Sequence, residues 1–432
     1  MSLRRAQVQF HALATGPEAV GRDQDGKAVF APFCAPDERA TVQIFEEKKD
    51  FARGIATEFE VLSAHRVAPP CPVFRPQTPE NSCGGCHLQH LETAFGRELK
   101  RQNLERQLRR ALRNSEFRVE SCESGADWNY RNKAEFRVQK TASGATEIGF
   151  YAHASHRLVS IENCLIQEPK NLETLRVARE NLALLERAQV SKILARVASS
   201  GEGFVAFEAA QNGAILRELA EIFRENLPHL VGIGAKIGKS RGEILWGRDF
   251  LCEEVSGVRF RVAGDGFWQI NAQTTPLMVA AALEFLELKN GENALDLYCG
   301  SGLFAVFMAR AGASVTGIES SAQAVENARF NARENGVSAR FFAGDCARLL
   351  KKERGPFDSI LLDPPRAGAK DAIPNLLRLA PQRLVYVSCD PATLARDLAL
   401  LCPHYKATRA RCFDVFAQTS HLETVVALEK CA

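Results

Sequence analysis

The 432-residue sequence lacks any run of about 18 or more apolar residues, so a membrane-spanning helix is not expected. Its first residues, MSLRRAQVQF, lack the apolar segment and small-residue cleavage site of a signal peptide. A net charge of only +3 means that any nucleic acid must be bound by local patches. Neither internal repeats nor low-complexity segments are present. A globular cytoplasmic protein of two or three domains, without a membrane partner, is expected.

Cysteine, by contrast, is abundant. The thirteen cysteines are odd in number and scattered, which is unlike a secreted disulfide scaffold. Clustered cysteines in a reducing compartment indicate metal binding or catalysis. The candidate metal ligands are Cys71, Cys83, Cys86 and Cys164. Four thiolates suit either a [4Fe–4S] cluster or structural zinc, and His87 and His90 are zinc-compatible alternatives.

The pattern of apolar residues changes along the chain. Short alternating strands with turn signals over residues 6–64 favour a small β-barrel. Residues 91–114 are helical by periodicity and carry seven basic residues against three acidic ones. A mixture of strands and helices follows from about 128 to 265. From about 273 onward, apolar strands alternate with helices, which predicts a doubly wound, largely parallel sheet that binds ligands at its carboxyl edge.

Acidic side chains end four successive strands of this sheet. The first strand runs into Asp296-Leu297-Tyr298-Cys299-Gly300-Ser301-Gly302, where glycines allow a tight turn and a close ligand. Glu319 ends the second strand and can accept hydrogen bonds from ribose hydroxyls. Asp345 could face an adenine amino group, and Asp363 ends the fourth strand. The dinucleotide fingerprint G-x-G-x-x-G is absent, so S-adenosylmethionine, which has no phosphate, suits this loop better than a pyrophosphate cofactor.

Cys389 follows the apolar strand RLVYVS and is the candidate nucleophile. A cysteine thiol is a good nucleophile once it is deprotonated. The neighbouring strand ends in Asp363-Pro364-Pro365-Arg366-Ala367-Gly368, whose paired prolines fix a rigid turn. Cys389 is expected beside this turn and opposite the cofactor loop, which favours a catalytic role for its thiol over a role as a buried apolar side chain.

The segments DLYCGSG, GIES, DPPRAG, SCDPATLARD and HLETV together resemble the RNA uridine-5-methyltransferases, and the resemblance extends over nearly the whole chain. Phe267-Trp268-Gln269-Ile270-Asn271 resembles the family segment whose glutamine contacts the cofactor. The resemblance implies that Cys389 adds to C6 of uracil and that Glu423 is the base that removes the C5 proton. It implies a cofactor site formed by Gln269, Tyr298, Leu303, Glu319, Asp345 and Asp363, with Leu303 contributing only its backbone.

The block CGGCHLQH resembles one branch of this family, which carries a [4Fe–4S] cluster and acts on 23S ribosomal RNA. We therefore expect Cys71, Cys83, Cys86 and Cys164 to hold such a cluster. We also expect the chain to be a monomer without an obligate protein partner. Three alternatives remain open. They are the same reaction on the T-loop uridine of transfer RNA, an amino-methyltransferase that needs no thiol, and an inactive RNA-binding iron–sulfur scaffold.

The resemblance also implies three domains. They are an OB-like, TRAM-type RNA-binding barrel over residues 1–66, a mixed α+β central domain over 67–265 with the cysteine cluster, and a Rossmann-like methyltransferase domain over 266–432. The segment 91–125 is expected to pack on the last domain. Arg101, Arg109 and Arg110 are candidates for phosphate contacts, and the aromatic and basic residues of 128–133 suit a flipped base.

Overall fold

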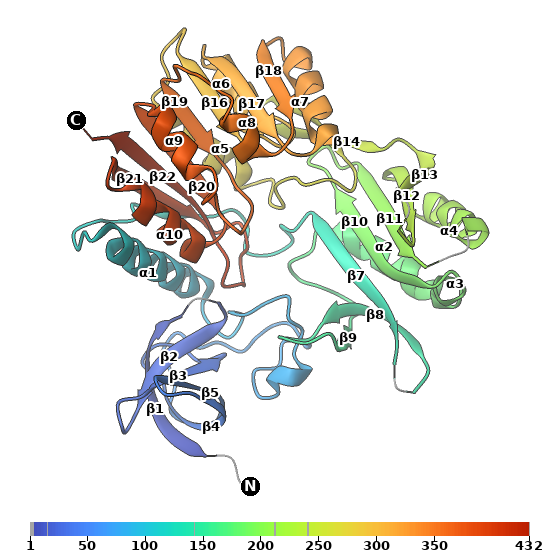
Figure 1. The fold of residues 1–432 in the computed structure, drawn as a ribbon. Coiled ribbons are helices and arrows are strands. Elements are labelled where there is room, and N and C mark those ends of the chain that lie inside the picture. The colour runs from blue at the N-terminus through green and yellow to red at the C-terminus, as the bar shows by residue number, and fades with distance from the viewer. Residues whose placement is uncertain (1–3, 15, 142, 211–212, 240–241, 432) are drawn as a thin grey trace.

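The computed structural model describes residues 4–14, 16–141, 143–210, 213–239 and 242–431. The N-terminal part is a closed five-stranded barrel with strand order β1-β2-β3-β5-β4, drawn in blue in Figure 1. Its strands are β1 (Arg5–Leu13), β2 (Glu18–Asp23), β3 (Ala28–Pro32), β4 (Arg39–Glu47) and β5 (Phe51–Val61). Alternate residues such as Ala6, Val8 and Phe10 are buried, as the period of a strand requires. The predicted barrel is confirmed.

A segment with a short 3-10 turn, η1 (Pro79–Asn81), leads from the barrel to helix α1 (Thr93–Leu112). Figure 1 shows α1 between the barrel and the C-terminal part of the chain. Leu99 packs in the barrel core, whereas Leu104 and Leu108 pack with Leu398 in a core of the C-terminal part. One helix thus joins two cores.

The central part is built on a seven-stranded sheet ordered β13-β12-β11-β10-β7-β8-β9. Its strands are β7 (Lys133–Lys140), β8 (Thr146–Tyr151), β9 (Leu158–Ser160), β10 (Val190–Val197), β11 (Gly203–Ala209), β12 (Leu230–Ile237) and β13 (Glu243–Gly247). Its helices are α2 (Pro169–Glu180), α3 (Leu182–Arg187) and α4 (Gly213–Asn226). Helices α2 and α3 are separated at Asn181, whose backbone leaves helical geometry (φ −120°) and whose side chain donates to the carbonyl of Val177 at 2.8 Å. A hairpin of β14 (Phe250–Val255) and β15 (Val258–Ala263) follows.

The C-terminal sheet has eight strands in the order β18-β17-β16-β19-β20-β22-β21-β6. They are β6 (Cys122–Glu123), β16 (Asn293–Leu297), β17 (Ser314–Glu319), β18 (Ala339–Ala343), β19 (Ser359–Leu362), β20 (Arg383–Ser388), β21 (Tyr405–Phe413) and β22 (Glu423–Lys430). Strands β16 to β20 are parallel, as predicted, and β22 runs antiparallel to β20.

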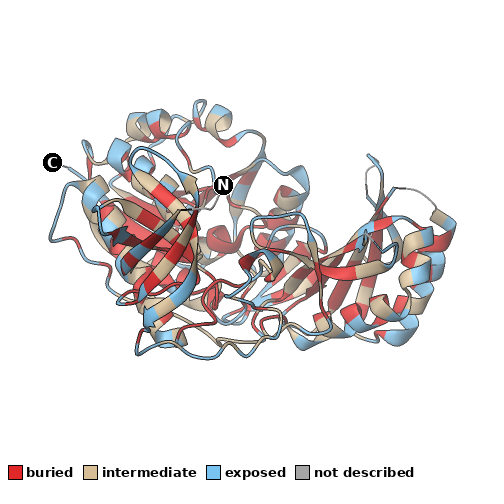
Figure 2. Ribbon diagram, turned by 90° about the horizontal axis from the view of Figure 1, so that it is seen from below, coloured by how far each residue is buried: buried red, intermediate tan, exposed pale blue. Residues whose placement is uncertain are grey.

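Two hydrophobic cores cover the two faces of this sheet. The helices that contribute side chains to these cores are α5 (Thr275–Leu286), α6 (Leu303–Arg310), α7 (Ala322–Glu334), α8 (Cys346–Leu350), α9 (Ile373–Leu379) and α10 (Pro391–Leu401). Along β19, Leu361 faces the core that includes α5 and α6, while Ile360 and Leu362 face the core that includes α9 and α10. Figure 2 shows buried residues concentrated on the strands and exposed residues on the outer sides of the helices. No helix of the described residues is long and apolar enough to cross a membrane.

Candidate active site

The loop after β16 is held in an unusual backbone conformation at the carboxyl edge of the C-terminal sheet. Tyr298 has φ +67°, which is uncommon for a residue with a side chain and is concentrated at functional sites. Gly302 has φ +86°, and a Cβ there would lie 3.1 Å from the Cβ of Ala328 on α7. A side chain at this turn would therefore be strained by the positive φ and would crowd α7. The loop leads directly into α6.

Three of the predicted carboxylates gather around this loop. Asp296 is fully buried; one oxygen accepts from the Ala305 amide at 2.8 Å, while the other has no partner among the described residues. Burial, with the nearby charges of Asp363 and Glu319, raises the pKa of Asp296 to about 8. Glu319 accepts from the amides of Gly300 at 3.2 Å and Ser321 at 2.7 Å, so it ties the ends of β16 and β17 together.

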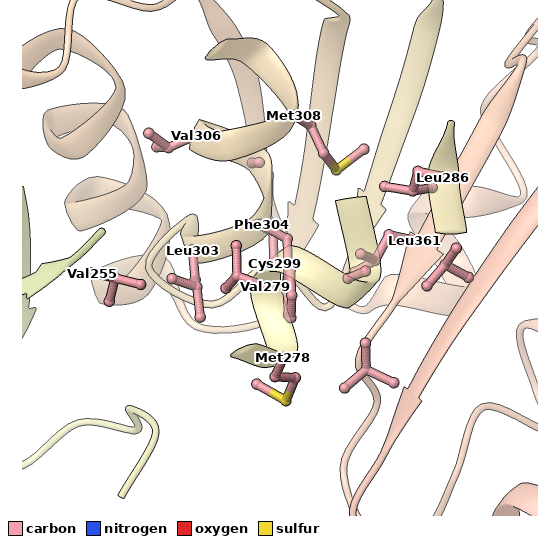
Figure 3. Close-up of a cluster of buried hydrophobic side chains, with 14 of the residues drawn as sticks. Val255, Met278, Val279, Leu286, Cys299, Leu303, Phe304, Val306, Met308 and Leu361 are labelled. Atoms are coloured by element: carbon pink, nitrogen blue, oxygen red, sulfur yellow. The ribbon is translucent and has the colours of Figure 1, made fainter. Parts of the chain in front are cut away.

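The other predicted cofactor residues are in varied positions. Asp345 is exposed and caps the short helix α8 through the amide of Arg348 at 2.7 Å. Gln269 is buried, and its backbone oxygen accepts from the side chain of Asn132 at 3.1 Å. The side chain of Leu303 lies in the apolar core with Phe304 and Met278 (Figure 3), so only its backbone can face a cofactor.

Cys389 and Glu423 are brought together by strand pairing. In the antiparallel pair β20–β22, Ser388 is opposite Thr424, so Cys389 and Glu423 occupy the next register position. Cys389 is half-buried, and burial together with the charge of Glu423 raises the pKa of its thiol to about 11. Glu423 is buried, and burial followed by the charge of Asp363 raises the pKa of its carboxyl. The thiol and two carboxyl groups are therefore electrostatic neighbours.

The sequence analysis predicts no role for two side chains of this site, Arg366 and Asp397. Arg366 lies in the DPPRAG turn, and its charge lowers the pKa of both Cys389 and Glu423. Asp397 on α10 is buried and accepts from the Tyr386 hydroxyl at 2.8 Å and the Ala369 amide at 2.7 Å. Asp397 thus fastens the end of the DPPRAG turn to β20 and α10. Both residues stand within recognised motifs, but nothing in the spacing indicated their contacts.

The four candidate metal ligands line one cavity of about 530 Å³. Burial raises the pKa of Cys83 to about 12, and the nearby thiols of Cys164 and Cys71 contribute to the rise. Over the described ranges, however, no group of three or more His, Cys, Asp or Glu residues is arranged to hold a metal ion. His87, a zinc-compatible alternative by sequence, instead places Nδ1 at 3.2 Å from the amide of Ser420.

The same cavity extends towards Cys389 and Glu423, since Arg366 and His421 also line it. Phe267 stands at this cavity with 76% of its surface exposed. Three residues that are predicted to contact RNA also have partners within the protein. Arg101 and Arg109 form ion pairs with Glu105 at 2.9 and 2.5 Å, and buried Tyr130 donates to the carbonyl of Ala417 at 2.8 Å.

Comparison with known proteins is consistent with this arrangement. The sequence model of the tRNA (Uracil-5-)-methyltransferase family matches residues 216–431. An uncharacterised RNA methyltransferase of Halalkalibacterium halodurans is 31% identical, covering 94% of this chain and 93% of the relative. One from Gloeobacter violaceus is also 31% identical, covering 98% and 96%. The crystal structure of Pyrococcus abyssi tRNA (uracil-54, C5)-methyltransferase with S-adenosyl-L-homocysteine matches with a TM-score of 0.75 and 25% identity, covering 98% of this chain and 99% of that one.

Fold and site together define a methyltransferase-type α/β enzyme that carries an N-terminal barrel. The chain belongs to the RNA uracil-5-methyltransferase family and is an S-adenosylmethionine-dependent RNA methyltransferase.

Proposed function

We propose that the chain methylates C5 of a uridine through a covalent bond between Cys389 and C6 of the base. The observation that supports this most is the strand register that sets Cys389 beside Glu423. Methyl transfer to a nitrogen or oxygen needs no thiol next to a buried carboxylate, whereas C5 of uracil is a poor nucleophile and must be activated. This favours the uridine reaction over an amino-methyltransferase.

In this mechanism the Cys389 thiolate adds to C6, and the resulting enolate carries its electron pair to C5. S-adenosylmethionine, when bound, supplies an electrophilic methyl group to that carbon. Glu423 then removes the C5 proton, the C5–H electron pair forms the C5=C6 double bond, and the C6–S bond breaks to release the thiolate. Burial and Asp363 raise the pKa of Glu423, so its carboxylate is a stronger proton acceptor than an exposed one.

We further propose that Gln269, Tyr298, Leu303, Glu319, Asp345 and Asp363 line the cofactor site. Most of them stand at the ends of β16 to β19, where a doubly wound sheet binds its ligand. Glu319 suits the ribose hydroxyls, Leu303 contributes its backbone, and Asp345 keeps one carboxylate oxygen beyond its helix cap.

A substrate with fluorine at C5 tests the covalent step, because fluorine cannot be removed as a proton and the adduct persists. We expect a denaturation-resistant protein–RNA crosslink at the peptide that contains Cys389. Cys389→Ser should abolish it, whereas Cys402→Ser, which removes another half-buried thiol, should not. Active enzyme that gives no crosslink at Cys389 would disprove the mechanism.

For the RNA substrate we propose two candidates, a uridine of 23S ribosomal RNA and the T-loop uridine of transfer RNA. The cysteine block favours the ribosomal candidate by resemblance. The similarity to a solved enzyme whose name states tRNA uracil-54 favours the transfer RNA candidate. Mapping 5-methyluridine in both RNA classes from a strain that lacks the gene decides between them. Loss from one class identifies the substrate, and an unchanged map in both contradicts the proposed function.

We also propose that Cys71, Cys83, Cys86 and Cys164 hold a [4Fe–4S] cluster. The donor set suits such a cluster, because four thiols from three segments line one cavity, and the charges of Cys71 and Cys164 help to raise the pKa of Cys83 and Cys86. A bound cluster would link these segments covalently. Iron and acid-labile sulfide in equal amounts are expected in protein purified without oxygen, and Cys164→Ser should lower both while Cys252→Ser should not. Zinc alone would indicate a structural zinc site instead.

A further inference from the structure

Lys100 is a buried lysine on α1 whose ammonium group has all of its donors satisfied by one loop. Its Nζ lies 2.6 Å from Asp414 Oδ1, 3.2 Å from the carbonyl oxygen of Phe416 and 3.1 Å from that of His421. The side chains of Lys100 and Asp414 are each only 2% exposed. An ammonium has three N–H groups, so these three acceptors use them completely.

The three acceptors belong to the connection between β21 and β22, residues 414–422. Asp414 is its first residue, and His421 lies two residues before Glu423. A single ammonium therefore binds both ends of the loop that delivers Glu423 to the active site. The middle of the loop is also held, since the carbonyl of Gln418 accepts from the amide of His87 at 2.8 Å and the Tyr130 hydroxyl donates to the carbonyl of Ala417.

We propose that Lys100 is a positioning residue that fixes the 414–422 loop so that Glu423 reaches the C5 proton of the methylated uridine. The inference rests on the proposed role of Glu423 as base. Lys100 acts through geometry, because the groups that shift the pKa of Glu423 are Asp363 and Arg366. Truncation of Lys100 leaves Asp414 as a buried carboxylate without its main partner, which frees the loop to move.

The two halves of the reaction should respond differently to this change. Addition of Cys389 to C6 and methyl transfer precede the proton removal and depend on β20 and the cofactor loop. Proton removal by Glu423, which lets the C5–H electron pair form the double bond and expel the thiolate, comes last. An enzyme with a misplaced Glu423 should therefore methylate once and then remain attached to its RNA.

The experiment uses the full chain, S-adenosylmethionine with a labelled methyl group, and unmethylated RNA from a strain that lacks the gene. Lys100→Met should transfer about one methyl group per chain in a rapid burst and accumulate a denaturation-resistant adduct with ordinary uridine. Its steady-state turnover should fall by about 100-fold, the cost of a misplacement of about 1 Å. Wild-type enzyme should accumulate no such adduct, and Glu423→Gln should accumulate it.

Arg383→Met is the matched control, because it breaks an ion pair with Glu292 at the opposite end of β20. It should turn over without adduct. If Glu423→Gln gives no adduct, the proposed function is wrong. If Glu423→Gln gives the adduct but Lys100→Met turns over normally, or loses the burst as well, the positioning role is wrong. If Lys100→Met does not fold, Asp414→Asn replaces it. We expect the same burst and adduct with a smaller loss of turnover, and normal turnover or loss of the burst would again contradict the positioning role.

Discussion

Replacing Arg366 by methionine tests whether this guanidinium controls the reactivity of Cys389. The burial of Cys389 and the charge of Glu423 raise the pKa of the thiol to about 11, whereas the charge of Arg366 lowers it. Methionine fills much of the same space without the charge. The pKa of Cys389 should therefore rise further in the variant, and less thiolate should be present at any pH below it.

The size of the effect follows from the exposure of Arg366. Two unit charges 4 Å apart interact by about 4 kcal/mol at an effective dielectric of about 20. Arg366 is exposed, so solvent screening leaves about 1 kcal/mol. That energy corresponds to about fivefold less thiolate. Because a thiolate of higher pKa is also about twofold more nucleophilic, the net slowing of alkylation should be about two- to threefold.

The assay is the rate of iodoacetamide alkylation at the Cys389 peptide, measured by mass spectrometry from pH 7 to 10. Lys370→Met is the control, because Lys370 is an exposed cation on the same loop. The Arg366→Met variant should react more slowly than the control at pH 8. Equal or faster alkylation in Arg366→Met would refute the assignment of Arg366 as the group that activates the thiol.

Three further predictions concern stability and RNA binding. Burial raises the pKa of Asp296 to about 8 from 3.8, so its contribution to stability is lost as the pH rises from about 4 to 8. The Tm of Asp296→Asn minus the Tm of wild type should therefore increase from pH 5 to pH 8. A decrease in this difference over the same range would contradict the prediction. Gly368→Ala, whose Cβ would lie 2.5 Å from the buried Oδ2 of Asp397 at φ +80°, should lose about 2–4 kcal/mol in urea unfolding. Gly336→Ala, with φ +66° and open surroundings, should lose only about 1–2 kcal/mol; equal losses would rule out the clash. Phe267→Ala should weaken RNA binding at least about fivefold in a filter assay if the exposed ring stacks on a base, and unchanged affinity would exclude stacking.

The parallel part of the C-terminal sheet was predictable because its strands are buried on both faces. Residues 359–362, SILL, are all buried, and such continuous apolar runs are typical of central parallel strands. Once those strands are recognised, the acidic residues at their ends must share one edge. The sequence alone therefore predicts Glu319 and Asp363 near the loop after β16. Their charges contribute to the raised pKa of Asp296 in β16.

Strand β21 escaped prediction because three basic residues obscure its alternation. Lys406 is exposed, whereas Arg409 and Arg411 pair with Glu120 at 2.6 and 2.7 Å and with Glu284 at 2.7 Å each. Those partners lie far away in the sequence, so no local pattern can reveal that the arginines are neutralised. The same limit applies to Arg101 and Arg109, which look like a basic helix face until Glu105 is seen to pair with both.

The direction of β22 decides whether the chemistry is possible. In a parallel sheet every strand presents its carboxyl end at the same edge, and the first residue of a strand lies at the opposite edge. Glu423 is the first residue of β22, so it reaches Cys389 only because β22 runs antiparallel to β20. Strand β21 also runs antiparallel to β22 and ends at the active-site edge, with Phe413 opposite Glu423. The loop 414–422 therefore turns the chain at this edge, and Lys100 of α1 binds both ends of the turn. The antiparallel direction of β22 thus sets Glu423, the proposed base, beside Cys389, the proposed nucleophile, and places the turn that Lys100 binds at the same edge.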